Sequence, residues 1–139
     1  MRIFLDANIL VSVLNKEYPL FTYAARIVSL ADNKKFTVYT SPVCLAIAFY
    51  FAEKKSGTQS AKQKIKLLSE KILIAEVGKN EVVRALQNKQ VNDFEDGMEY
   101  YAAINNKCEV IVTEDTGDFY FADIKVCRAR NFLEEFLFS

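Results

Sequence analysis

The sequence predicts one α/β domain in which helices cover both faces of a central parallel sheet. Short apolar runs alternate with amphipathic segments along the chain, and no repeat, linker or low-complexity stretch interrupts them. Hydrophobic residues make up 51% of the 139 positions. A chain of this length and composition buries one core, and regular alternation of strands and helices favours a parallel sheet. We therefore expect residues 1–139 to form a single domain.

Five runs have the composition of short buried strands, because they are rich in aliphatic, aromatic and β-branched residues. The first ends at Asp6, and the fourth ends at Thr113. The fifth is the shortest and least regular of the set. The expected strands are residues 2–5, 36–40, 72–77, 109–113 and 123–127.

Helix signals fill the intervals between these strands. Ser41 followed by Pro42 predicts an N-cap with proline in the first turn, and Ser56-Gly57 predicts the end of that helix. Asn80 is the expected cap of a helix that carries Val83 and Leu86 on one face. The expected helices are residues 8–14, 21–33, 42–55, 60–70, a segment beginning at 80, a segment beginning at 93, and 131–137.

The composition excludes several classes of chemistry. The chain contains no histidine, which rules out Ser-His-Asp and Cys-His catalysis and every zinc site that needs histidine. Its three cysteines are far apart, and we expect buried, reduced thiols in a cytoplasmic protein. Lys+Arg and Asp+Glu both number 18, so no global field draws the protein to nucleic acid. No run approaches the roughly 20 apolar residues of a membrane span.

Acidic residues stand where strands end or helices begin. Asp6 follows the first expected strand, Asp115 and Asp118 follow the fourth, and Asp93 and Asp96 open a helix. In a parallel sheet these positions meet at one edge. Each acid alone is more often a cap or a turn residue, but carboxylates gathered at one edge repel each other unless a cation lies between them. The joint pattern predicts a divalent-metal site.

The same residues resemble a known family. Residues 3–10, Ile-Phe-Leu-Asp-Ala-Asn-Ile-Leu, are similar to the opening of a PIN domain. Asp93-Phe-Glu-Asp96, followed by the segment 110–119, resembles the second half of such a domain. The agreement runs from residue 1 to about 133. The resemblance implies a three-layer α/β/α sandwich with a mostly parallel sheet of about five strands in the order 3-2-1-4-5. It also implies Mg²⁺- or Mn²⁺-dependent hydrolysis of RNA, as in VapC-like toxins of toxin–antitoxin pairs.

By position in that family, the resemblance assigns a role to each acidic station. Asp6, Asp96 and Asp115 would be metal ligands, and Asp118 a ligand or an acid just behind the ligands. With no histidine, proton removal would fall to a carboxylate such as Asp118 or to hydroxide on the metal. The residues expected to support the ligands are Asn8, Thr113 and Asp93, the last as a helix cap.

One position departs from the family pattern. A further acid, commonly Glu, usually follows the second strand, and alignment through Thr40-Ser41 places isoleucine, Ile47, at that position. Glu53 lies six positions later, roughly 240° further round a helix at about 100° per residue, so it faces another way. Isoleucine binds no metal, so we expect either a weakly held ion or an impaired enzyme.

Two alternatives remain open beside the nuclease. A PIN-like module that binds an antitoxin, a second copy or RNA without cutting is favoured by Ile47. A haloacid-dehalogenase-like phosphatase would use Asp6 as nucleophile but needs a second acid where this chain has Asn8.

The expected partners of the nuclease are RNA, an antitoxin protein and a second copy of the chain. Aromatic residues 49–51 could supply a homodimer interface or belong to the core. Lysines 54, 55, 62, 64 and 66 could steer the RNA backbone.

Overall fold

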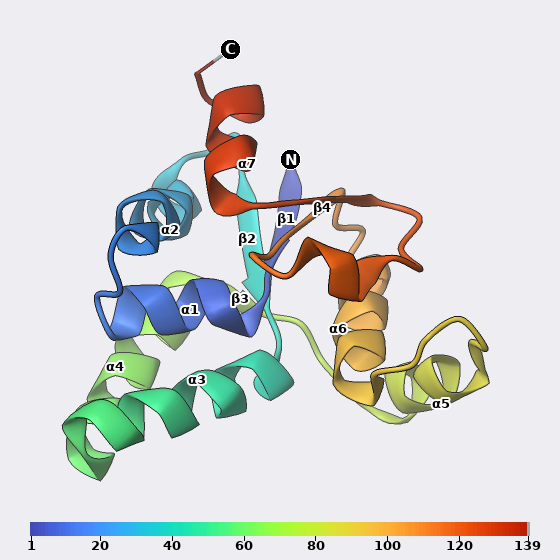
Figure 1. The fold of residues 1–139 in the computed structure, drawn as a ribbon, viewed down its shortest axis with the longest axis horizontal. Helices are drawn as coiled ribbons and strands as arrows, with labels where there is room; N and C mark the ends of the chain where they lie inside the picture. The colour runs from blue at the N-terminus through green and yellow to red at the C-terminus, as the bar shows by residue number, and fades with distance from the viewer. Residues whose placement is uncertain (139) are drawn as a thin grey trace.

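The structure, a computed structural model, describes residues 1–138. Its centre is a sheet of five parallel strands in the order β3-β2-β1-β4-β5 (Figure 1). The strand order and the α/β class match the expectation, and the sheet is parallel throughout rather than mostly parallel. The strands are β1 (Arg2–Leu5), β2 (Thr37–Thr40), β3 (Leu73–Ile74), β4 (Val110–Val112) and β5 (Lys125–Cys127).

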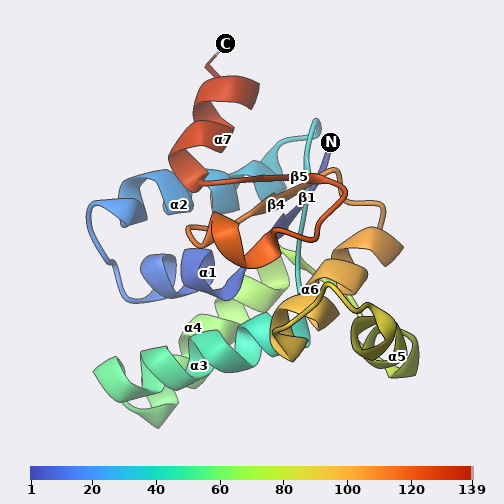
Figure 2. The same ribbon diagram turned by 45° about the vertical axis from the view of Figure 1, so that its right-hand side comes forward.

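Helices cover both faces of this sheet. On one face α1 packs against α2 and α3, α4 packs on α3, and α7 packs on α2. The pair α5 and α6 lies on the other face (Figures 1 and 2). The helices are α1 (Ala7–Leu14), α2 (Leu20–Ser29), α3 (Pro42–Ser56), α4 (Thr58–Lys71), α5 (Lys79–Gln87), α6 (Phe94–Asn105) and α7 (Ala129–Phe136), with short 3-10 turns η1 (Leu30–Asp32) and η2 (Thr116–Phe119).

The centre of the hydrophobic core is formed by the middle strands of the sheet. Ile3, Phe4 and Leu5 of β1 are fully buried, as expected of a strand with neighbours on both edges and helices on both faces. The three cysteines are buried and free. Within residues 1–138, no helix is both long enough and apolar enough to cross a membrane.

Capping at α3 agrees with the prediction, whereas capping at α5 does not. Ser41 Oγ accepts a hydrogen bond from the backbone N–H of Cys44 at 3.2 Å. The N-cap of α5 is Gly78, and Glu81 reaches back to accept its backbone N–H at 2.7 Å. The helix therefore begins before Asn80, which was the expected cap and lies in its first turn. The carboxylate of Glu81 caps the helix by accepting the free backbone N–H of Gly78.

The structure also refines the helix α5 and shortens the third strand, which was expected at residues 72–77. The helix begins at Lys79 rather than at residue 80, and the apolar residues Val83 and Leu86 are 37% and 69% exposed, while its buried positions are Glu81 and Ala85. The third strand is only two residues long, because β3 pairs with β2 along one edge only and the chain leaves the sheet after Ile74.

Candidate active site

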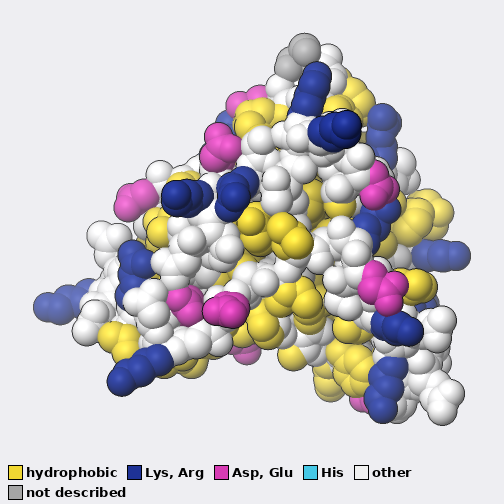
Figure 3. Space-filling model, turned by 180° about the vertical axis from the view of Figure 1, so that it is seen from behind, with side chains coloured by type: hydrophobic (Ala, Val, Ile, Leu, Met, Phe, Trp, Pro, Cys, Tyr) yellow, Lys and Arg dark blue, Asp and Glu magenta, His cyan; other side chains and the backbone are white. Residues whose placement is uncertain are grey.

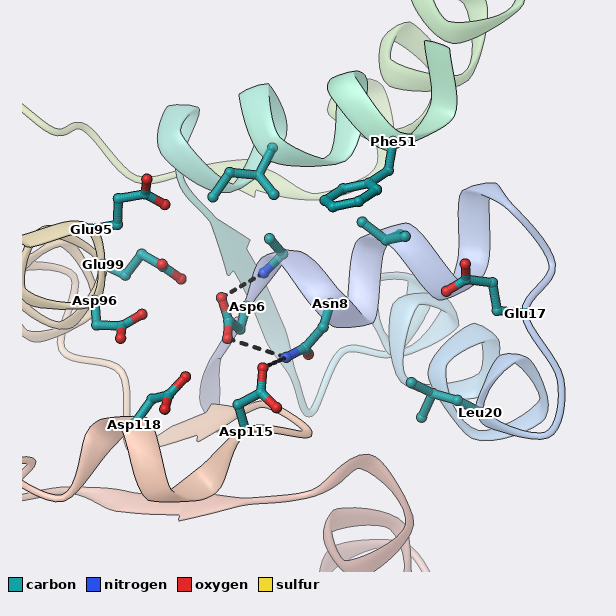
Figure 4. A pocket seen from close by; sticks show the side chains of 13 residues that line it. Asp6, Asn8, Glu17, Leu20, Phe51, Glu95, Asp96, Glu99, Asp115 and Asp118 are labelled. Carbon is teal, nitrogen blue, oxygen red and sulfur yellow. Dashed lines mark hydrogen bonds between the residues drawn. The ribbon is translucent and has the colours of Figure 1, made fainter. Parts of the chain in front are cut away.

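The carboxyl ends of β1 and β4 open into a cavity of about 450 Å³. These two strands are adjacent where the strand order reverses, the position at which open α/β sheets leave room for ligands. Figure 4 shows carboxylates from several segments pointing into this space. The cavity is lined by Asp6, Ala7, Asn8, Val11, Glu17, Leu20, Ile47, Phe51, Glu95, Asp96, Glu99, Asp115 and Asp118.

Asp6 is held at the centre of the cavity by hydrogen bonds to both of its oxygens. It is the N-cap of α1, and its Oδ1 accepts the backbone N–H of Ala7 at 2.7 Å. Its Oδ2 accepts the hydroxyl of Thr113 at 2.7 Å. The side chain is nearly buried, at 8% exposure. This carboxylate is therefore fixed in direction before any ligand arrives.

Thr113 and Asn8 connect Asp6 to Asp115. Asn8 Nδ2 donates to Thr113 Oγ1 at 3.1 Å and to Asp115 Oδ2 at 3.2 Å, and it lies 3.5 Å from Asp6 Oδ2. The Thr113 hydroxyl also accepts the backbone N–H of Asp115 at 3.1 Å. The sequence-predicted supports thus lie between two sequence-predicted ligands, more than a hundred positions apart in the chain.

Helix α6 brings Asp96 to the opposite wall. Asp93 caps this helix, and its Oδ1 accepts the backbone N–H of Asp96 at 3.1 Å, but Asp93 does not line the cavity. Burial raises the pKa of Asp96 from 3.8 to about 7, and the nearby carboxylates of Asp93, Asp6 and Asp118 act in the same direction. A carboxyl with this pKa binds a proton readily unless a cation takes its place.

Asp118 lies at the solvent-exposed rim of the cavity, in η2. Loss of hydration raises its pKa, and the charges of Asp115 and Asp6 add to the effect. All four acids that the sequence nominated as ligands therefore line one cavity.

Sequence reasoning missed Glu99, the most buried acid in the cavity. Its side chain is 1% exposed, and Oε1 accepts the thiol of Cys44 at 2.9 Å. Burial and the proximity of Asp6 raise the pKa of Glu99 well above its usual value. The sequence did contain a signal for Glu99. It follows Asp96 by three positions, so the two carboxylates share one face of the helix.

Helix α3 contributes no carboxylate to the cavity. Ile47 lies on the cavity wall, as the alignment of residues 40–41 implied for that position. Glu53 does not line the cavity, and its Oε2 accepts the hydroxyl of Thr58 at 2.8 Å. The wall formed by α3 is instead apolar, with Phe51 one turn beyond Ile47.

The lysines nominated for RNA steering lie along the distal part of α3 and on α4, and none lines the acidic cavity. Lys54 lies over the ring of Tyr50, 5.1 Å from its centroid, and Lys55 donates to the carbonyl of Asn15. On the face opposite to Figure 1, basic side chains are spread over the surface rather than gathered in one patch (Figure 3). Of the aromatic residues 49–51, Phe49 packs on the core while Tyr50 and Phe51 are 53% and 44% exposed.

The donor set of the cavity fits a hard divalent cation. Its polar lining consists of carboxylates and one amide, and no lysine or arginine is among its described lining residues. Oxygen ligands of this kind are those that Mg²⁺ and Mn²⁺ prefer. The candidate ligands among the lining carboxylates are those of Asp6, Asp96, Asp115, Asp118 and Glu99. Within the described residues, the potential ligand atoms found within 4.8 Å of one another are those of Asp6, Glu99 and the thiol of Cys44.

An acidic cavity at the switch point of a parallel α/β/α sheet is the arrangement expected of a PIN domain, and comparison with known proteins agrees. A family model described as PIN domain matches residues 2–117, so the chain belongs to the PIN domain family. It is 26% identical over 140 residues to Ribonuclease VapC1 of Aquifex aeolicus (strain VF5), covering 96% of this chain and 94% of that protein.

Solved structures show the same fold. VapBC-1 from nontypeable Haemophilus influenzae matches with a TM-score of 0.70 and 18% identity, covering 94% of this chain and 99% of the other. Mycobacterium tuberculosis VapC20, described as a sarcin-ricin loop cleaving toxin, matches with a TM-score of 0.68 and 19% identity, covering 88% and 95% of the two chains. The resemblance to PIN domains and to their VapC-like members is thereby confirmed.

Proposed function

We propose that this protein is a Mg²⁺- or Mn²⁺-dependent endoribonuclease of the VapC type. The observation that carries the proposal is the convergence of carboxylates from three separate segments, the end of β1, the start of α6 and the stretch after β4, into one cavity that has no basic lining residue among those described. Family membership supports the same activity, since the relative from Aquifex aeolicus is named a ribonuclease. Four carboxylates at one sheet edge are unfavourable without a cation, and phosphodiester hydrolysis makes use of one.

The residues of the cavity would have different roles in the proposed hydrolysis. When bound, Mg²⁺ or Mn²⁺ supplies charge neutralisation at the phosphate and a lowered pKa for an attacking water. Asp6, Asp96 and Asp115 would hold the ion, and Thr113 and Asn8 fix the first and last of them.

The proposed proton acceptor is Asp118. It lies at the exposed rim of the cavity, where an RNA strand and its attacking water would enter. Its raised pKa brings the carboxylate closer to the range in which a general base works well near neutral pH.

Partners follow from the same proposal. The substrate is RNA, and the proposed protein partners are an antitoxin and a second copy of the chain, acting together in the cytoplasm. The exposed rings of Tyr50 and Phe51 on α3 offer apolar surface for one of these contacts.

The test is cleavage of RNA by the purified protein with Mn²⁺, with and without EDTA. We expect endonucleolytic fragments that EDTA abolishes, and Asp6→Asn should lower the rate by about a hundredfold or more, a loss of at least about 2.7 kcal/mol of barrier reduction. Asp123→Asn is the matched control, because Asp123 is exposed and lies outside the acidic cavity. Equal rates for wild type and Asp6→Asn would refute the proposal.

Ile47 favours a second candidate, a PIN-like module that binds its partners without cutting. A module of that kind need not bind metal, so calorimetry with Mn²⁺ separates the two: tight binding to wild type together with RNA cleavage supports the nuclease. Family membership leaves the phosphatase alternative without support.

A further inference from the structure

We propose that Glu99, from helix α6, takes the metal-ligand position that Ile47 leaves without a carboxylate on helix α3. The inference rests on the proposed metal-dependent function and assigns a ligand that the sequence motif does not contain. Glu99 would then be the fourth acid of the metal site, and it would come from α6 on the wall opposite to α3.

The position of Glu99 supports this role. It follows Asp96 by one helical turn, lines the same cavity and is 1% exposed. In Figure 4 its carboxylate points toward Asp6. Ligand atoms of Asp6, Cys44 and Glu99 all lie within 4.8 Å of one another, close to the roughly 4.2 Å that two metal–oxygen bonds of about 2.1 Å span. Glu99 thus reaches the centre of the site, which Glu53 on α3 does not.

Cys44 explains how the carboxylate is oriented. It stands on α3 one turn before Ile47, and its thiol donates to Glu99 Oε1 at 2.9 Å. Burial and the charge of Glu99 raise the pKa of the Cys44 thiol well above its usual value, so Cys44 acts as a hydrogen-bond donor rather than as a thiolate. Helix α3 therefore still contributes to the fourth acid by positioning it.

Glu99 is buried in the cavity without a basic neighbour among the described lining residues. Burying a carboxylate costs several kcal/mol unless charge or hydrogen bonds compensate it. Glu99 accepts a hydrogen bond from the thiol of Cys44, which is a weak donor. Its other close partner is another acid, Asp6, with which it can share a hydrogen bond only while one of the two carboxyl groups keeps a proton. None of the described residues lining the cavity is basic. A divalent cation held by Asp6 and Glu99 would allow both carboxylates to be ionised at neutral pH.

The test measures Mn²⁺ affinity by isothermal titration calorimetry, a readout independent of RNA cleavage. Glu99→Gln keeps the shape and the acceptor for the Cys44 thiol but removes the charge. Outer-sphere partners of bound metals change affinity by about 10–100-fold, so loss of a direct ligand should weaken Mn²⁺ binding by about tenfold or more. Glu95→Gln is the matched control, because Glu95 is an exposed acid on the same helix and cavity wall, and it should change affinity by less than about threefold.

Two further variants test whether Glu99 takes the place of an acid at position 47. If Glu99 replaces the α3 acid, Ile47→Glu should restore Mn²⁺ affinity in the Glu99→Gln background and add little in wild type, a non-additive cycle. Unfolding in urea with EDTA checks that each variant is folded.

Loss of affinity in Glu99→Gln with recovery on adding Ile47→Glu supports the inference. Loss of affinity without recovery overturns it, because Glu99 then does not take the position that Ile47 leaves. Wild-type affinity in Glu99→Gln overturns it while leaving the metal-dependent function intact. Absence of Mn²⁺ binding in the wild type overturns both, and equal losses in Glu95→Gln and Glu99→Gln show general charge effects rather than ligation and overturn the inference alone.

Discussion

Replacing Thr113 by valine should destabilise the metal-free protein by about 2–3 kcal/mol. The fully buried hydroxyl donates to Asp6 Oδ2 at 2.7 Å and accepts the backbone N–H of Asp115 at 3.1 Å. A hydrogen bond to a charged acceptor contributes about 1.5–3 kcal/mol. The Asp115 amide lies beside the cavity, where water can replace the lost acceptor, so it adds only a fraction of a further kcal/mol.

The assay is urea unfolding in EDTA, with Thr113→Ser as the matched control. Serine keeps the hydroxyl and loses one methyl group, which costs about 0.8–1.5 kcal/mol. Thr113→Val keeps the volume and loses the hydroxyl. Valine should therefore be the more destabilising of the two, although it preserves the packing. If Thr113→Val unfolds at the same urea concentration as Thr113→Ser or above it, the polar connection between Asp6 and Asp115 does not hold the site together as argued here.

Two further predictions concern pH and packing. The pKa of Asp96 is raised to about 7 in the folded protein, so its stabilising contribution is present below about pH 4 and is lost as pH rises through 7. The free energy of unfolding in EDTA should fall less for Asp96→Asn than for wild type between about pH 5 and pH 8. A difference between the two proteins that does not change with pH would contradict the raised pKa of Asp96. A Cβ on Gly97 would lie 2.7 Å from Val91 and 2.9 Å from Ala85, so Gly97→Ala should cost about 1–3 kcal/mol. Gly117→Ala, with open space around the new methyl, should be close to neutral, and comparable melting temperatures for the two variants would argue against this packing.

The fold was largely predictable because the central strands are buried on both faces. Continuous apolar runs such as residues 3–5 and 110–112 have few alternatives to a parallel strand. The third strand and the cap of α5 were less predictable, since β3 is an edge strand with exposed Leu73 and Ile74, and Glu81 caps α5 from within its first turn. The local sequence does not show that β3 would be a short edge strand or that Glu81 rather than Asn80 would cap α5.

The acidic cavity was predictable in part. Asp6 and Asp115 follow strand ends, and topology alone brings such positions to one sheet edge. Glu99 was not recognised, because a carboxylate in the middle of an amphipathic helix normally faces solvent. Only the packing of α6 against the start of α3, with Cys44 beside it, shows that this acid faces the cavity. The position of Ile47 at the site was implied by the resemblance to PIN domains, through the alignment at Thr40-Ser41.

The most direct measurement is the anomalous difference density of a crystal soaked in Mn²⁺. We expect a single strong peak bounded by the carboxylates of Asp6, Asp96 and Asp115, and its loss in crystals of Asp6→Asn. A saturating soak that leaves this cavity without a peak, or places manganese only on other surfaces, would contradict the claim that these acids converge in order to hold a cation.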